Sequence, residues 1–270
     1  MPVARLATAS ALLALFCAGL LLLPNLYWGA LLLAGLAIAA WEWAVLARYR
    51  GALRWLFVAL VVASATVLLL HPGAAALQGP LYGLSAAFWA LIAWPWLARK
   101  WRPEGALALG AAGWVVLVPT WLALTALQAR PGELLALLAV VWIADTAAYF
   151  VGRRVGRHRL APQISPGKTW EGLMGAALAV AVYYCLLWVA FGAGRTAAEV
   201  IGGLVAFGAV TALSVEGDLF ESWMKRQAGV KDSGTLLPGH GGVLDRIDSL
   251  TAGMPFAALW LQYFGPSGIL

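Results

Sequence analysis

The chain has 270 residues, of which 63% are hydrophobic and 11% are charged, and its mean hydropathy is +0.84. A soluble domain carries about 25% charged residues, so this composition excludes a water-exposed surface and indicates a protein whose main solvent is the bilayer. The net charge of +6 comes without a continuous basic patch, which argues against nucleic-acid binding, and the two cysteines and three histidines are too scattered for a disulfide framework or a His-rich metal cluster.

Nine apolar runs are long enough to cross the hydrocarbon, because a membrane-spanning helix needs about 20 apolar residues. The sequence therefore predicts an all-α, polytopic membrane bundle of about nine transmembrane helices. The first run is interpreted as a span and not as a signal peptide, because residues 22–24 offer no small-residue cleavage site and another span follows at once. The runs lie near residues 7–23, 26–46, 53–70, 81–97, 106–127, 133–151, 171–191, 198–217 and 250–265.

Lysines and arginines alternate along the chain in a way that predicts its topology. Alternate segments between the runs carry sixteen of these residues against two. Because basic residues are retained on the cytoplasmic side, the N-terminus and the two longest polar loops are predicted to be cytoplasmic and the C-terminus to lie outside.

Polar residues are unevenly distributed between the two halves of the chain. Residues 1–130 contain few acids, chiefly Glu42 and Glu104, and no evident repeat, so they are predicted to be a transmembrane scaffold. Residues 131–270 are predicted to be the catalytic transmembrane region, with cytoplasmic loops at 152–170 and 220–249. Glu42 is interpreted as a structural or lipid-facing polar residue.

The sixth run contains an acid, and the loop after it contains a phosphate-loop-like sequence. Asp145 lies at hydrocarbon depth, where an ionisable residue indicates either a functional role or a hydrogen bond to a neighbouring helix. Gly167-Lys168-Thr169 resembles the end of a P-loop, but Pro162 stands where the motif requires glycine. A helix beginning after Thr169 can still bind a phosphate at its N-terminus.

A polar helix is predicted to follow the eighth run. Its acids, hydroxyl and bases recur at spacings of three and four residues, which places them on one helical face. A carboxylate near the membrane edge requires a partner or a cation. The residues of this face are Asp218, Glu221, Ser222, Lys225 and Arg226.

The segment that follows combines glycines with two further acids. Gly239, Gly241 and Gly242 allow the backbone to approach a phosphate closely. Asp245 and Asp248 lie one helical turn apart at the start of the ninth run. Carboxylates are natural Mg²⁺ ligands beside substrate phosphates, so the segment indicates phosphoryl or nucleotidyl transfer; the alternative is that these charges only solvate a loop.

Together these motifs resemble the signature of bacterial phosphatidate cytidylyltransferases, over about residues 140–260. The resemblance is carried by four polar stretches and by four upstream motifs. They are Ser222-x-x-Lys225-Arg226, Lys231-Asp232-Ser233-Gly234, Pro238-Gly239-His240-Gly241-Gly242 and Asp245-Arg246-Ile247-Asp248, with Asp145-Thr146-x-x-Tyr149, Gly152-Arg153, Gly156-Arg157-His158 and Ser165–Gly172 upstream.

The resemblance implies that CTP and phosphatidic acid give CDP-diacylglycerol and diphosphate at the cytoplasmic face of the bacterial inner membrane. It also implies Mg²⁺, with a monovalent cation such as K⁺ beside it, and a homodimer. Asp218 and Asp245 match the metal ligands. The predicted catalytic residues are Asp218, Ser222, Lys225, Arg226, Asp245 and Asp248. The predicted substrate-binding residues are Ser165, Lys168, Thr169, Lys231, Asp232, His240, Gly241, Gly242 and Arg246.

Two other functions are alternatives to cytidylyl transfer. A CTP-dependent lipid kinase, acting for example on a polyprenol, would need similar metal and phosphate chemistry. A transporter using Asp145, Glu42 and Asp218 as an ion path predicts internal symmetry, which the sequence does not show, and leaves the glycine-rich segment unexplained.

Overall fold

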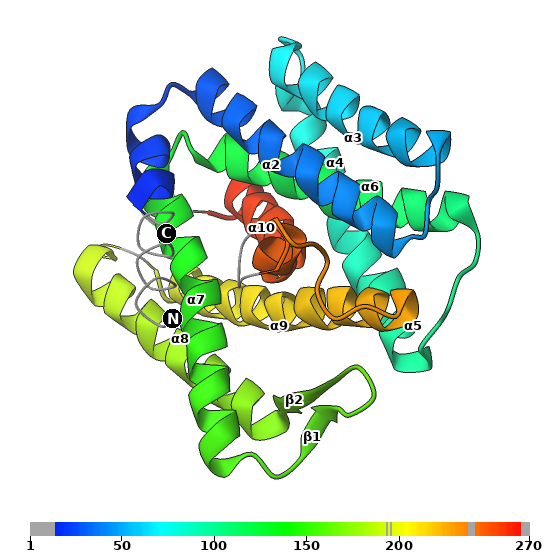
Figure 1. The fold of residues 1–270 in the computed structure, drawn as a ribbon. Helices are drawn as coiled ribbons and strands as arrows, with labels where there is room; N and C mark the ends of the chain where they lie inside the picture. Colours follow the sequence, from blue (N-terminus) through cyan, green and yellow to red (C-terminus); the bar gives the residue numbers. More distant parts are fainter. Residues whose placement is uncertain (1–13, 193, 195, 237–240, 266–270) are drawn as a thin grey trace.

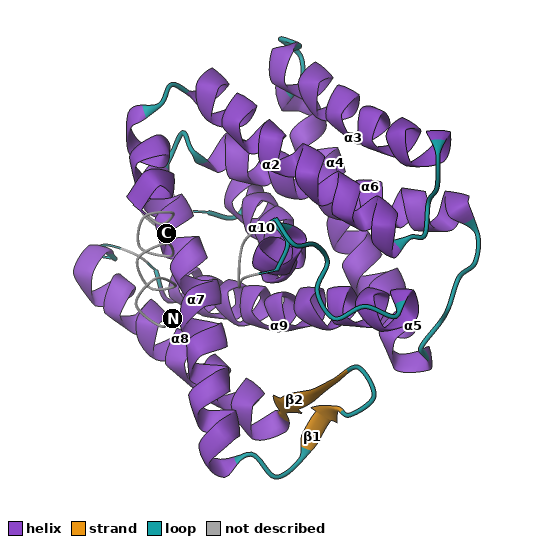
Figure 2. Cartoon of the chain, viewed as in Figure 1, coloured by secondary structure: helices purple, strands orange, loops and turns teal. Residues whose placement is uncertain are grey.

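The computed structural model describes residues 14–192, 194, 196–236 and 241–265, and these are almost entirely helical (Figures 1 and 2). Residues 14–22 are helical and lead into the long helices. The elements are α2 (Asn25–Leu46), α3 (Ala52–Leu70), α4 (Ala75–Phe88), η1 (Trp89–Ala93), α5 (Trp94–Arg99), α6 (Ala106–Leu127), α7 (Pro131–Val155), β1 (Arg159–Ala161), β2 (Ser165–Thr169), α8 (Trp170–Phe191), α9 (Ala197–Ala228) and α10 (Leu244–Tyr263).

Seven helices in the described part of the chain are long and apolar enough to cross a bilayer: α2, α3, the continuous helix from Ala75 to Arg99, and α6 to α9. The predicted count of nine is not confirmed. Residues 7–13 of the first predicted span lie outside the described residues, and its described part is helical over residues 14–22. The ninth is α10, which begins at Leu244 and not at 250, and so includes Asp245 and Asp248 in its first turns.

α10 lies at the centre of the bundle, between α9, α4 and α6 (Figure 1). Its Ala252, Met254 and Ala257 are each at most 1% exposed. Helix α10 therefore meets protein on most sides rather than lipid, which explains how a helix with charged residues in its first turns is accommodated at this position.

The helix from Ala75 to Arg99 changes its winding before its end. Pro95 has no N–H to offer the carbonyl of Leu91, and its ring crowds that carbonyl. The chain accommodates this with the π-helical turn η1 at Trp89–Ala93, and α5 continues from it.

The basic segments gather at one end of the bundle, as the charge alternation predicts. The Arg48 side chain, after α2, donates to the backbone carbonyl of Gln227 at the end of α9. Trp223 Nε1 of α9 donates to the carbonyl of Trp101, after α5, at 2.8 Å. The loops after α2, α5 and α9 therefore share a face of the molecule.

A two-stranded antiparallel hairpin joins α7 to α8 at this same end (Figure 2). Ala161 pairs with Ser165 across β1 and β2, and Arg226 Nε of α9 donates to the carbonyl of Ile164 in the turn at 3.3 Å. The all-α prediction did not include this element. Thr169 ends β2 and caps α8, because its hydroxyl accepts a hydrogen bond from Gly172 N at 3.1 Å.

α9 is one helix of 32 residues, so the predicted eighth span and the predicted polar helix are continuous. A capping box between Thr196 and Glu199 begins the helix, and Gly229, with φ of +76°, ends it. About two-thirds of the way along, Gly217 lies against the backbone carbonyl of Asp248 on α10, so that a Cβ there would overlap the oxygen.

We expect Gly217→Ala to lower the stability of the protein by about 2 kcal/mol, because overpacking forces α9 and α10 apart. The measurement is the melting temperature of the purified protein in detergent. Gly208→Ala is the matched control on the same helix, since nothing lies within 4 Å of a Cβ at Gly208. A control variant as unstable as Gly217→Ala would contradict the packing argument.

Candidate active site

A first charged group joins the hairpin to α9. Lys168 Nζ of β2 lies 2.6 Å from Asp218 Oδ2, and the Ser222 hydroxyl donates to Asp218 Oδ1 at 3.2 Å. The Lys168 and Asp218 side chains are 20% and 29% exposed, so the pair is accessible from one side. The structure thus brings together two residues predicted to be catalytic and one predicted to bind substrate.

A second charged group joins α9 to α10. Lys225 Nζ lies 2.6 Å from Glu221 Oε2 and 2.6 Å from Asp245 Oδ1, and its side chain is only 13% exposed. Asp245 Oδ2 accepts three further hydrogen bonds, from the backbone N–H and hydroxyl of Ser233 at 2.9 Å each and from Gly242 N at 2.8 Å. Asp245 is therefore held as a carboxylate by donors on all sides.

Two further acids, Asp145 and Asp248, interact electrostatically with residues of these charged groups. Asp248 interacts with Asp218, Lys225 and Lys168, and Asp145 of α7 interacts with Asp218 and Lys168. Five carboxyl groups thus share two ammonium groups. The carboxyl groups belong to Asp145, Asp218, Glu221, Asp245 and Asp248.

This excess of carboxyl groups fits a cation, but not a preformed cage. No three acid, cysteine or histidine side chains converge on a common point within the described residues. Mg²⁺ usually takes only one or two carboxylates and completes its shell with substrate phosphates and water. The donor set around Asp218 and Asp245 therefore suits a metal that binds together with a polyphosphate.

A polar cavity of about 590 Å³ opens beside the first group. It is lined by Asp145 and Asp218 and by the three upstream residues predicted to bind substrate, which are Ser165, Lys168 and Thr169. Tyr149, Arg153 and Arg159 also line it. The cavity therefore presents basic and hydroxyl groups opposite carboxylates, a setting that suits a bound triphosphate.

Three lining residues were absent from the predicted site. Tyr149 and Arg153 lay in motifs of the resemblance, whereas Arg159 had been counted only as a loop charge. Arg153 Nη1 donates to the Tyr149 hydroxyl at 2.9 Å, one helical turn away on α7. The α7 helix extends to Val155, beyond the predicted span, and carries both residues to the cavity.

Four of the five residues on the predicted polar face of α9 belong to the two charged groups. Asp218 pairs with Ser222 and Glu221 with Lys225, each at a spacing of four. Arg226 is exposed and turns to the hairpin, so it belongs to neither charged group.

Arg246 is likewise exposed, on the first turn of α10. Asp248, two positions further along the helix, is not its partner: no ion pair joins these two described residues. Arg246 is free to reach a ligand from the loop side.

The loop between α9 and α10 carries the remaining predicted residues. Lys231 and Asp232 are exposed. Gly241 has φ of +78°, a conformation that favours glycine, and a Cβ there would lie 2.6 Å from Asp245 Oδ2. Gly242 donates to that same oxygen. His240 lies outside the described residues.

Glu42 of α2 is a part of this site that the sequence interpretation left to the scaffold. Its carboxylate accepts the backbone N–H of Val243 at 3.1 Å and that of Leu244 at 2.7 Å, and it lies 3.1 Å from the Ser233 hydroxyl, whose one proton goes to the closer Asp245 Oδ2. The α10 helix has no side-chain cap of its own, so Glu42 binds its free N–H groups. A structural role for Glu42 is confirmed, whereas a lipid-facing position is excluded by its 4% exposure.

Comparison with known proteins gives the family. The model of the cytidylyltransferase family matches residues 3–264. The chain is 38% identical to a phosphatidate cytidylyltransferase of Pseudomonas aeruginosa over 97% of its own length and 98% of that protein. It is also 49% identical to one of Haemophilus influenzae over 46% of its length and 43% of that protein.

The chain therefore belongs to the cytidylyltransferase family. Its long apolar helices make it an integral membrane protein.

We expect Glu42→Gln to lower the stability of the protein by about 2 kcal/mol, because hydrogen bonds to a charged acceptor contribute roughly that much when buried. The amide also brings N–H donors toward the N–H groups of Val243 and Leu244. The melting temperature in detergent measures the effect. Glu104→Gln, at an exposed carboxylate before α6, should leave the melting temperature unchanged, and equal losses in both variants would refute the capping role.

Proposed function

We propose that the protein is a CTP:phosphatidate cytidylyltransferase that makes CDP-diacylglycerol and diphosphate for phospholipid synthesis. The observation that carries the proposal is the polar cavity lined by the Lys168–Asp218 pair, with a second lysine–carboxylate pair, Lys225–Asp245, further along α9 at the basic end of an apolar bundle. Family membership and the full-length likeness to a phosphatidate cytidylyltransferase support the same activity.

The chemistry is a displacement at phosphorus. A phosphate oxygen of phosphatidate forms a bond to the α-phosphorus of CTP, and the bond from that phosphorus to the bridging oxygen of the β-phosphate breaks. Diphosphate leaves with the electron pair. The attacking phosphate is already an anion at neutral pH, so no general base is required. The protein has to position two anions and offset their charge.

The residues divide into two sets for this task. Ser165, Lys168 and Thr169 bind phosphates of CTP in the polar cavity, and Lys225 and Arg226 bind the phosphatidate phosphate or the charge that develops in the transition state. The exposed Lys231, Asp232 and Arg246, with His240 and the glycines, contact the nucleotide from the loop. Asp248 maintains the negative field between the two lysines.

Asp218 and Asp245 would hold Mg²⁺, with K⁺ beside it. The metal supplies charge neutralisation of the triphosphate and of the leaving group. Lys168 and Lys225 contact those carboxylates, and with a cation held there the same two side chains would be available to substrate phosphates.

The site faces the cytoplasm in this proposal, since basic residues mark that side and CTP is there. The protein is an enzyme of the bacterial inner membrane and acts as a homodimer. Substituted-cysteine labelling in inverted and right-side-out vesicles tests the orientation: a cysteine at the exposed Lys231 should react from the cytoplasmic side only.

The activity is tested by incubating purified protein with Mg²⁺, phosphatidic acid and CTP carrying label in the cytosine ring. The proposal requires labelled lipid and free diphosphate. A lipid kinase would instead leave the label in soluble CDP, and that result would replace the proposal.

We expect Asp218→Asn and Asp245→Asn each to lower kcat by about 1000-fold or more, since losing one charge-stabilising group typically costs a factor of 100 to 1000 and the metal would be lost with it. The assay is cytidylyl transfer by variants that insert and purify normally. Glu104→Gln serves as the control. Near-normal activity in either aspartate variant would overturn the metal assignment.

Removal of divalent cation should stop the reaction, because the triphosphate charge is then uncompensated. The measurement is the rate after dialysis against chelator, followed by titration with Mg²⁺. Recovery with Mg²⁺ is expected, and full turnover in excess chelator would show that the lysines alone suffice.

A further inference from the structure

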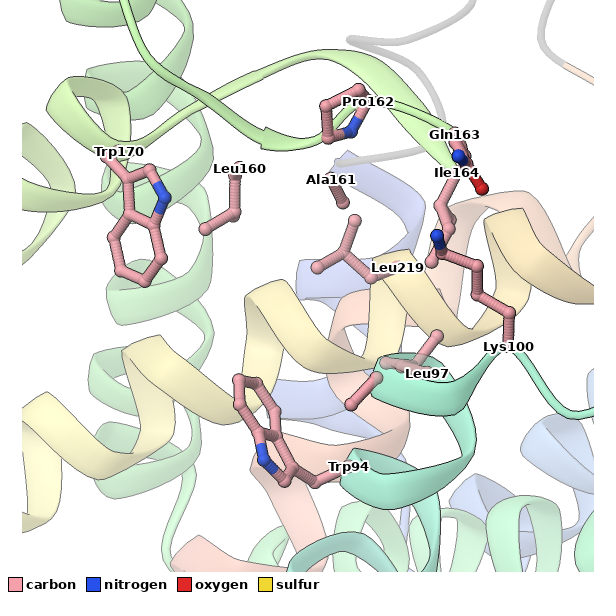
Figure 3. Close-up of a pocket in the computed structure, with 11 residues that line it drawn as sticks. Trp94, Leu97, Lys100, Leu160, Ala161, Pro162, Gln163, Ile164, Trp170 and Leu219 are labelled. Carbon is pink, nitrogen blue, oxygen red and sulfur yellow. The ribbon is translucent and has the colours of Figure 1, made fainter.

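A second cavity, of about 390 Å³, also lies against the hairpin. Figure 3 shows its walls: the hairpin above with Leu160 and Ala161, α5 with Trp94 and Leu97, and Trp170 at the start of α8. Leu219 of α9 reaches into the space between them. The walls are apolar, and Lys100 is the one charged side chain among the lining residues.

This apolar cavity lies at the boundary between the bundle and the membrane. Trp94 and Trp170 are 60% and 50% exposed on helices long and apolar enough to span a bilayer. Tryptophans in such positions lie at the level of the lipid headgroups. Lys100, just after α5, offers a cation at the same level to an anionic lipid.

The apolar and polar cavities adjoin through two structural elements. Leu160 of the hairpin lines both of them. On α9 the consecutive residues Asp218 and Leu219 line one each, the carboxylate in the polar cavity and the isobutyl group in the apolar one. The polar and apolar cavities therefore meet at adjacent residues of α9. A molecule with a phosphate at one end and a hydrocarbon chain at the other can contact both.

We propose that the apolar cavity under the hairpin binds an acyl chain of the phosphatidate substrate, so that the lipid enters between α5 and α8 and presents its phosphate to the CTP bound in the polar cavity. This inference rests on the proposed function. Bulk lipid or a second copy of the chain are the other possible occupants, and each predicts a different result below.

The test fills the cavity with a larger side chain. Ala98 of α5 and Ala161 of β1 both line the cavity, so Ala98→Trp and Ala161→Trp each occupy part of it by separate routes. Ala90→Trp is the matched control, because Ala90 is an exposed alanine on the same continuous helix outside the cavity lining. The KM for phosphatidate is measured at varied surface concentration in mixed micelles, together with kcat and the KM for CTP.

We expect each cavity variant to raise the KM for long-chain phosphatidate about tenfold, because each methylene group kept out of an apolar site costs about a factor of four in affinity. The kcat and the KM for CTP should stay within about twofold of the unmodified protein. With dihexanoyl phosphatidate, whose chains are too short to depend on the cavity, the difference should largely disappear.

Each contrary outcome has a distinct meaning. An unchanged KM for long-chain phosphatidate in both cavity variants would show that the cavity holds only bulk lipid, and the inference would fail while the activity stands. A change of oligomeric state in the cavity variants alone, by size exclusion in detergent, would assign the cavity to a second copy of the chain. If the unmodified protein makes no CDP-diacylglycerol from either lipid, the proposed function itself fails.

Discussion

The contact of Lys225 with Glu221 and Asp245 connects the two helices on which the candidate site is built. All three side chains are at most 13% exposed, and removing one partner of such a buried group typically costs about 3–5 kcal/mol because the others stay buried and unpaired. The same contact sets α10 against α9, where Gly217 permits the approach to Asp248. Asp218, Asp245 and Asp248 keep their relative positions through this packing.

The long helices could be predicted from hydrophobic run length, and the polar face of α9 from its spacing. Contacts four residues apart, such as Asp218–Ser222 and Glu221–Lys225, follow from helical geometry alone. The start of α10 could not be found in this way, because Asp245, Arg246 and Asp248 interrupt the apolar run. Hydropathy assumes that a helix meets lipid, whereas α10 meets other helices.

The contacts between distant segments could not be predicted from spacing. Lys168 and Asp218 were each assigned to the site, yet nothing in a one-dimensional pattern states that their side chains meet at 2.6 Å. The hairpin escaped prediction because its strands have three and five residues and include Pro166 and Gly167, which are more typical of turns. Arg159 was missed because any arginine in such a loop also satisfies the charge rule for topology.

Glu42 has a consequence for how the protein is made. Its carboxylate belongs to α2, but the backbone groups that it binds lie about 200 positions later. During synthesis α2 is in the membrane well before Val243 leaves the ribosome. The Glu42 carboxylate therefore has no backbone N–H groups of α10 to bind until the last helix has been made. A fragment that begins after residue 130 lacks Glu42, so the first backbone N–H groups of α10 would have no carboxylate to bind. Co-expression of the two halves as separate chains, by contrast, supplies both the Glu42 carboxylate and the α10 helix that it caps. A protein divided in this way can still assemble the candidate site.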